Sequence, residues 1–308
     1  MKSQKLKGNL ILLLTSFIWG TSFIAQSKGV EEISPFAFNG VRSVLGGLVL
    51  IPVIIFMSLR SKKQSKDTKT LLLGGLICGT FLCVASTLQT AGMIYTSPGK
   101  SGFITALYMV IIPIIGLFTH KKPEPVIWLS VLIAVAGLYL MCIDSRLTIN
   151  FGDVLTLLCA FVFAGHILAV DYFSPKTDGV KLACLQFFVC GILNLIWVFA
   201  FEKPELAPIW SCRMSICYSG IMSCGVAYTL QIVGQKYTDP TSASILMSLE
   251  SVFATLTTVV LVACGWQLTG GALSMREILG CVLMFAAIIL VQAPEFCKNK
   301  SAASSQNM

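Results

Sequence analysis

Two ionisable side chains, Glu250 and Arg42, interrupt long apolar runs of this sequence. A charged side chain at membrane depth is costly, and it is usually paired, faces a cavity or carries a proton. Glu250 is therefore a candidate for proton coupling or for binding a substrate amine, although a structural hydrogen bond to a neighbouring helix would also explain it. Arg42 cannot lose its charge and needs a carboxylate, an array of carbonyls or an anionic substrate group. For Arg42, a structural pairing near a helix end or the outer interface is the favoured interpretation, and substrate contact is the alternative.

Further candidates for a binding cavity are aromatic or hydrogen-bonding side chains inside the apolar runs. They are Trp19, Gln89, Tyr108, Phe163, His166 and Gln231. A buried amide must be hydrogen-bonded, but a contact between helices satisfies it as well as a ligand does. A lone histidine on an apolar helix is more often structural than part of a proton relay. His166 stays among the cavity candidates because a histidine can titrate near neutral pH.

The sequence offers little support for catalytic, metal or cofactor chemistry. Its 12 cysteines are scattered singly, without a CxxC pattern, so they are interpreted as small buried residues. The segment 99–101 (GKS) lacks the glycine that a phosphate-binding loop needs five positions earlier, where Ile94 stands. Neither His120 nor His166 belongs to an HExxH pattern. We therefore expect no enzyme activity, no metal and no cofactor.

The composition indicates which elements must position these residues. Of 308 residues, 56% are hydrophobic and 12% are charged, against about 25% charged in a soluble domain. Long apolar runs recur along the chain, and about 20 apolar residues in a helix span a bilayer. The runs do not alternate as the strands of a membrane β-barrel do. The sequence predicts an all-α polytopic membrane protein, and its net charge of +8 need not indicate nucleic acid, since Lys and Arg gather on the cytoplasmic side of membrane proteins.

One stretch occurs twice. Residues 84–98 read VASTLQTAGMIYTSP, and residues 226–240 read VAYTLQIVGQKYTDP, with nine identities at a constant offset of 142. A repeat of this length indicates two fused halves and not a solenoid. The same offset aligns Tyr108 with Glu250, and a slightly longer one aligns Trp19 with Phe163.

The predicted organisation has two repeats of five spans each. Residues 1–9 form a basic cytoplasmic tail, residues 10–143 the first repeat, residues 152–293 the second repeat, and residues 298–308 a disordered cytoplasmic tail. The expected spans are 10–26, 34–58, 71–94, 98–118, 126–143, 153–171, 181–201, 214–235, 241–263 and 277–293.

The basic residues predict the orientation. With the N-terminus inside, 15 Lys and Arg residues lie in inside segments and six in outside loops, so both termini are expected in the cytoplasm. Because five is an odd number, the second repeat would be inserted upside down relative to the first. About ten spans in two inverted five-helix repeats are the architecture of many secondary transporters.

Three segments resemble a known family. They are LQTAGMIYTSPGKSGFITALYMVIIPIIG (88–116), QKYTDPTSASILMSLESVFATL (235–256) and FIWG (17–20). The chain resembles the EamA family of the drug/metabolite transporter superfamily over nearly its whole length. The resemblance implies a ten-helix fold with a central cavity and export of amino acids or other small metabolites. The family often has Glu-Pro in the ninth span, but Ser251 follows Glu250 here, so a smaller bend is expected.

The function expected from the sequence is secondary transport. We expect an exporter of small metabolites, such as amino acids, that works by alternating access across the cytoplasmic membrane. The alternatives are an importer on the same fold and an intramembrane enzyme acting on a lipid-linked substrate. The expected partners are the lipid bilayer, a small-molecule substrate and a proton as the candidate coupling ion, with the chain a monomer or a homodimer and without nucleic acid. The repeated stretches are candidate gates, and Gln89, Tyr108, Gln231 and Glu250 are the residues expected to face the ligand.

Overall fold

The computed structural model describes residues 2–60, 67–96, 98–118, 124–142, 149–265 and 274–304. Within these ranges the chain is helical apart from short turns, and no strand occurs. Eight helical segments are long and apolar enough to cross a membrane, and two shorter apolar helices cover Pro125–Leu140 and Ile278–Leu290. The prediction of an all-α polytopic membrane protein is confirmed.

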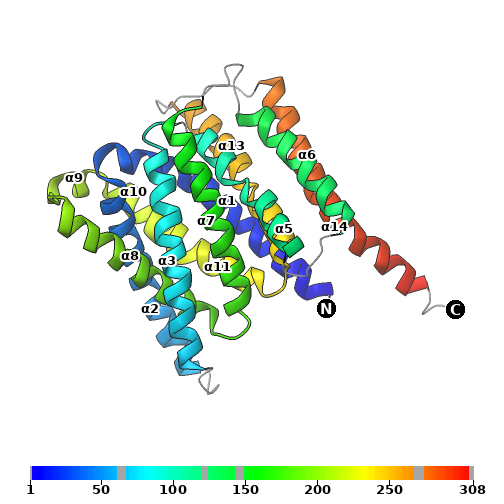
Figure 1. Cartoon of the computed structure of the whole chain (residues 1–308), viewed down its shortest axis with the longest axis horizontal. Helices are drawn as coiled ribbons and strands as arrows, with labels where there is room; N and C mark the ends of the chain where they lie inside the picture. Colours follow the sequence, from blue (N-terminus) through cyan, green and yellow to red (C-terminus); the bar gives the residue numbers. More distant parts are fainter. Residues whose placement is uncertain are drawn as a thin grey trace.

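The helices pack together as a bundle (Figure 1). Those that precede residue 149 are α1 (Lys2–Glu32), α2 (Pro35–Arg60), α3 (Thr68–Gly92), α4 (Pro98–Thr105), α5 (Tyr108–Phe118) and α6 (Pro125–Cys142). Those that follow are α7 (Phe151–Phe173), α8 (Gly179–Phe201), α9 (Leu206–Ser211), α10 (Arg213–Tyr218), the π-helix η1 (Ser219–Ala227), α11 (Tyr228–Gln235), α12 (Pro240–Met247), α13 (Glu250–Ala263) and α14 (Met275–Ser304).

Polar capping residues at the ends of the apolar runs start several of these helices. Asp67 accepts hydrogen bonds from the Thr70 hydroxyl and the Lys69 amide, and these bonds hold the pKa of Asp67 below its ordinary value. Asn150 and Asp153 form a reciprocal capping box at α7. Asp239 caps α12, and Pro240 occupies its first turn. The helix starts are therefore encoded locally.

The pair α6 and α14 lies side by side on one flank of the molecule, where α6 contacts α4 and both helices contact α12 (Figure 1). A Cβ atom on Gly137 would come within 2.8 Å of the Gly280 carbonyl oxygen, so small residues let these two backbones approach closely. α14 continues as a helix to Ser304, into the segment that the sequence predicted to be a disordered tail.

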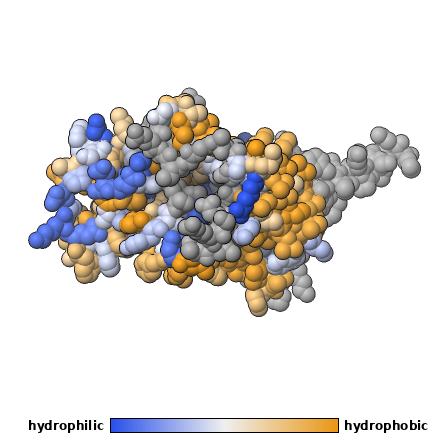
Figure 2. Space-filling model, turned by 90° about the horizontal axis from the view of Figure 1, so that it is seen from above, coloured by the Kyte–Doolittle hydropathy of each residue, from blue (hydrophilic) through white to orange (hydrophobic). Residues whose placement is uncertain are grey.

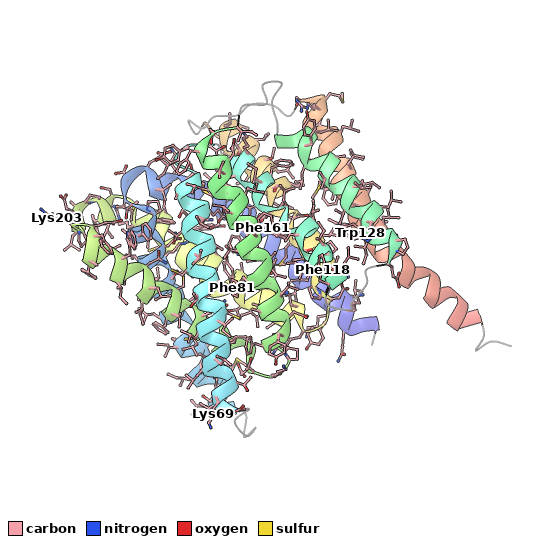
Figure 3. The ribbon with its side chains drawn as sticks, in the orientation of Figure 1. Lys69, Phe81, Phe118, Trp128, Phe161 and Lys203 are labelled. Atoms are coloured by element: carbon pink, nitrogen blue, oxygen red, sulfur yellow. The ribbon has the colours of Figure 1, made fainter. Side chains whose placement is uncertain are left out.

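Large apolar side chains cover the outer wall of the bundle. Phe81, Phe118 and Phe161 are exposed on helix flanks, and Lys69 marks one end of the molecule (Figure 3). Seen from above, hydrophobic residues cover one flank of the molecule, while hydrophilic residues gather toward the opposite side (Figure 2). An apolar surface of this extent is what a bilayer solvates, since lipid replaces water there.

The two repeated stretches make matching contacts at their ends. Thr96 donates a hydrogen bond of 3.0 Å to Asp153 Oδ1, and Thr238 donates one of 3.0 Å to Asn9 Oδ1. Each threonine thus binds the first helix of the opposite half, at Asp153 in the first turn of α7 and at Asn9 in α1. The two contacts differ in charge, because Lys100 Nζ also lies 2.6 Å from Asp153 Oδ2, where the equivalent position is the neutral Asn9.

Candidate functional site

A cavity lies at the centre of the bundle between helices of both halves of the chain, and small-molecule sites in proteins are usually concave and mostly apolar. α1 contributes three residues at helical spacing, and α2, α3, α4, α5, α7, η1, α11 and α13 contribute the remainder. The lining residues are Trp19, Phe23, Gln26, Arg42, Gln89, Thr105, Tyr108, Phe163, Ile167, Ser223, Tyr228, Gln231 and Glu250. The cavity brings together every residue that the sequence analysis put forward except His166.

Two helix interruptions shape the wall. α4 ends at Thr105 and α5 begins at Tyr108, while α12 ends at Met247 and α13 begins at Glu250. Tight i→i+3 bonds replace the α-helical pattern at both places, as in the 3.3 Å bond from Leu249 N to Leu246 O. Ser251 stands here where the family often has proline, and the helix is interrupted directly before Glu250. Tyr108 and Glu250 therefore both begin a half-helix.

Tyr108 and Glu250 meet across the cavity. The Tyr108 hydroxyl donates a 3.2 Å hydrogen bond to Glu250 Oε1. Both side chains are buried, at 3% and 4% exposure. Over the described ranges, no Lys, Arg or His nitrogen lies within 4.0 Å of the Glu250 carboxyl group. Glu250 is thus a membrane-depth carboxyl group that is held by a neutral partner.

Arg42 also faces the cavity and is held by neutral partners. Its Nε donates to Asn39 Oδ1 at 2.8 Å, and its Nη1 donates to Gln26 Oε1 at 2.7 Å. The guanidinium lies 5.4 Å from the centre of the Phe38 ring. No carboxylate of the described chain pairs with it. Arg42 is thus held by two amides and not by an ion pair.

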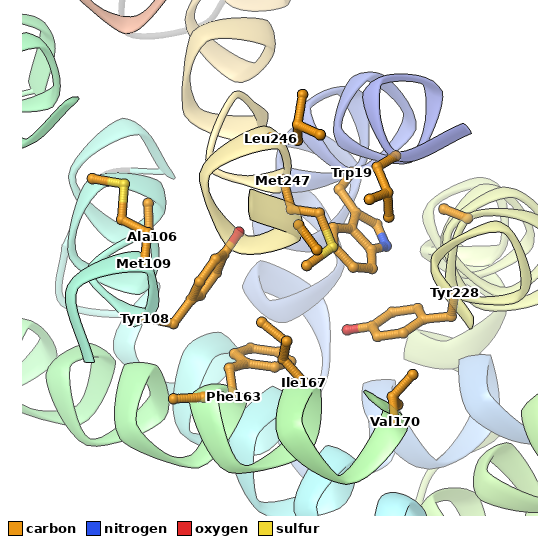
Figure 4. Packing of buried hydrophobic residues seen from close by; sticks show 14 of the residues in the cluster. Trp19, Ala106, Tyr108, Met109, Phe163, Ile167, Val170, Tyr228, Leu246 and Met247 are labelled. Atoms are coloured by element: carbon orange, nitrogen blue, oxygen red, sulfur yellow. The ribbon is translucent and has the colours of Figure 1, made fainter. Parts of the chain in front are cut away.

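The remaining polar lining residues carry amides, hydroxyl groups and an indole. Gln89 Nε2 donates to the Thr105 hydroxyl at 3.2 Å. Gln231 Oε1 and Trp19 Nε1 are buried and find no hydrogen-bond partner among the residues that the structure describes. The Trp19 ring packs against Tyr228 with centroids 4.6 Å apart, and Phe163 and Ile167 lie opposite (Figure 4).

His166 is fully buried but lies outside the cavity wall. Its Nε2 lies 3.2 Å from Gln186 Oε1, and its ring neighbours are Phe163 and Tyr228, which do line the cavity. His166, which the sequence analysis placed among the cavity residues, therefore lies behind the residues that line the cavity.

Several liners were not put forward from the sequence. Gln26 could have been found, because Trp19, Phe23 and Gln26 follow the i, i+4, i+7 spacing of one helix face. Tyr228 and Ser223 gave no comparable signal in the sequence, because the direction in which their side chains point depends on the winding of η1 and α11. In the described part of the chain, no three His, Cys, Asp or Glu side chains gather in a way that could hold a metal ion.

Comparison with known proteins places the chain among transporters. The model of the EamA-like transporter family matches residues 6–143 and again residues 150–293. An uncharacterized transporter of Archaeoglobus fulgidus is 30% identical over 94% of this chain and 86% of its own length. The uncharacterized transporter YwfM of Bacillus subtilis is 26% identical over 97% and 99%, and the uncharacterized inner membrane transporter YedA of Escherichia coli is 25% identical over 89% and 87%. A solved crystal structure shares the fold with a TM-score of 0.72 at 19% identity, over 93% of this chain and 96% of that one.

Proposed function

Because the chain belongs to the EamA-like transporter family, we propose that it is a secondary transporter that exports small metabolites, such as amino acids, by alternating access. It is a multi-pass membrane protein, and the charge distribution supports a cytoplasmic membrane location with both termini inside. An importer on the same fold is the alternative, since the direction of a carrier follows the gradients that drive it.

The observation that carries this proposal is the cavity between two interrupted helices. Secondary transporters typically bind their substrate near the bilayer midplane, where discontinuous helices from two repeats meet. Here α4–α5 and α12–α13 break at repeat-equivalent positions, and Tyr108 and Glu250 line one cavity from the two breaks. The double match of the family model, once to each half, agrees with a duplicated scaffold.

The matching end contacts support alternating access. Two inverted repeats would give the molecule two similar gates, one for each side of the membrane. In both the Thr96–Asp153 and the Thr238–Asn9 contacts a threonine hydroxyl donates to a side-chain oxygen, and the contacts join equivalent parts of the two halves. We place the gates at these two contacts, with the binding cavity between them.

Glu250 is the proposed proton-coupling residue. It is the one carboxyl group among the lining residues, and a carboxylate at membrane depth is costly enough to favour exchange of a proton. The alternative of an intramembrane enzyme would call for a clustered nucleophile or several carboxyl groups, and among the described lining residues Glu250 is the one carboxyl group.

Reconstitution of the full chain into proteoliposomes tests the proposal. Vesicles loaded with a panel of radiolabelled amino acids and organic acids should release at least one of them faster than protein-free vesicles. Substitution of both Tyr108 and Glu250 by alanine should reduce that release, whereas the exposed Lys203→Ala should not. Release that is indifferent to the double substitution would remove this cavity from the transport route.

A further inference from the structure

The cavity wall holds a permanent positive charge that neutral groups only partly satisfy. Arg42 is 3% exposed, and a guanidinium carries five N–H donors. Asn39 and Gln26 accept from two of these donors. Among the described residues, the remaining donors have no carboxylate within reach.

A buried arginine without an anion is an expensive arrangement. Desolvation of a lone charge inside a membrane protein is costly, and such residues are normally paired or mark the path of a substrate. Amide oxygens solvate the guanidinium but do not neutralise it. An anionic ligand would do so, and the planar fork of arginine matches a carboxylate with two parallel hydrogen bonds.

Two further polar atoms of the same wall form no hydrogen bond with the described residues. Trp19 Nε1, on a side chain of 8% exposure, is a donor, and Gln231 Oε1, on a side chain of 1% exposure, is an acceptor. Buried polar groups are hydrogen-bonded in the great majority of cases, so this donor and this acceptor show where a ligand in the cavity would form hydrogen bonds. The indole N–H adds a donor suited to an oxygen of the ligand.

The charged and aromatic side chains of the cavity wall indicate which class of ligand fits. Arg42 is the one cationic side chain in the lining, and the one carboxyl group there, that of Glu250, is bonded to Tyr108 and does not pair with Arg42. A single positive charge balances a carboxylate, whereas a phosphate monoester carries about −1.5 to −2 at neutral pH. The aromatic liners Trp19, Phe23, Tyr108, Phe163 and Tyr228 offer an apolar surface to the body of the ligand.

We propose that Arg42 is the anion-recognition residue of this cavity and that the substrates are small monocarboxylates with an apolar or aromatic body. The inference rests on the proposed transport function, because it assigns the substrate of the same cavity. Gln26 and Asn39 orient the guanidinium, and the unpaired N–H groups receive the carboxylate.

Binding to the purified full chain tests the assignment. Benzoate, 3-phenylpropanoate and 4-methylpentanoate are compared with their carboxamides and with phenyl phosphate, with apparent Kd taken from ligand-dependent thermal shifts. The wild type should bind at least one acid tenfold or more tighter than its amide and than phenyl phosphate. Arg42→Gln should remove this preference, Arg42→Lys should keep part of it, and the exposed Arg213→Gln should leave it unchanged. Equal binding of every acid and its amide, or an unchanged preference in Arg42→Gln, would overturn the assignment.

A second variant protects the test against misfolding of Arg42→Gln. Gln26→Glu places a carboxylate beside the guanidinium, so the protein's own anion competes with the ligand while Arg42 stays paired. Acid binding should fall about tenfold or more and amide binding should stay the same; undiminished acid binding contradicts the proposal.

Counterflow in proteoliposomes distinguishes a failure of the proposed transport function from a failure of the role proposed for Arg42. An acid preference without flux would contradict transport alone, and flux with the same acid-to-amide ratio in wild type and Gln26→Glu would contradict the role of Arg42 alone.

Discussion

Tyr108 and Glu250 occupy equivalent positions in the two halves of the chain, and the phenol of one donates a 3.2 Å hydrogen bond to the carboxyl group of the other. Each residue begins a half-helix, α5 in one case and α13 in the other. The pair therefore joins the two interrupted helices at the cavity. A change in the protonation of the Glu250 carboxyl group would therefore alter the hydrogen bond that joins the two half-helices.

Glu250→Gln should separate binding from coupling. The amide oxygen still accepts the Tyr108 hydrogen bond, but the side chain no longer exchanges a proton. We expect proteoliposome efflux to persist and to lose its dependence on an imposed pH gradient. Gradient-dependent efflux that matches the wild type would exclude Glu250 as the coupling residue. Glu205→Gln, on an exposed loop, is the matched control.

Tyr108→Phe should weaken the link between α5 and α13. Loss of the hydroxyl leaves a buried carboxyl oxygen without its donor, which typically costs about 1–3 kcal/mol. Thermal unfolding in detergent should occur at lower temperature than in the wild type. If the hydrogen bond is the cause, Tyr108→Phe should add little destabilisation in a Glu250→Ala background, as measured by a double-mutant cycle.

Gly20→Ala should disturb the contact between α1 and α13. A Cβ atom at Gly20 would come within 2.5 Å of Phe253 Cβ and 2.7 Å of the Glu250 carbonyl oxygen, so the backbones must separate. Overpacking of this kind typically costs about 1–3 kcal/mol, and it would also displace Glu250 from the cavity. We expect lower thermal stability and slower transport.

Gly225→Ala is the control for this substitution. The nearest atom to a Cβ there is 3.5 Å away, which is an ordinary contact. This variant should keep both stability and transport close to those of the wild type. If Gly20→Ala behaved in the same way, the close approach of α1 to α13 would be unimportant.

Asp153→Asn should loosen one end of the molecule and leave the other unchanged. The substitution removes the ion pair with Lys100 and makes this end resemble Asn9–Thr238. Breaking a largely buried ion pair destabilises its surroundings. Hydrogen–deuterium exchange should become faster in residues 149–156 and stay constant in residues 236–242. Equal changes at both ends would argue against independent gates.

Much of the fold was predictable because its determinants are local. Apolar runs of membrane-crossing length, capping residues such as Asp67 and Asp239, and the repeated stretch all lie within short windows. The same repeat aligned Tyr108 with Glu250, and helical spacing could have added Gln26 to Trp19. The family resemblance was carried by residues 88–116, 235–256 and 17–20, and it was confirmed by the match to both halves.

The sequence by itself determined the helical membrane architecture, the family and most of the residues of the cavity. Only the tertiary structure decided that neutral amides of α1 and α2 hold Arg42, that His166 lies behind the wall, and that Tyr108 binds Glu250. The reason is physical. Hydropathy and capping act over a few residues, whereas the partner of a buried polar group depends on how helices far apart in the chain pack against each other.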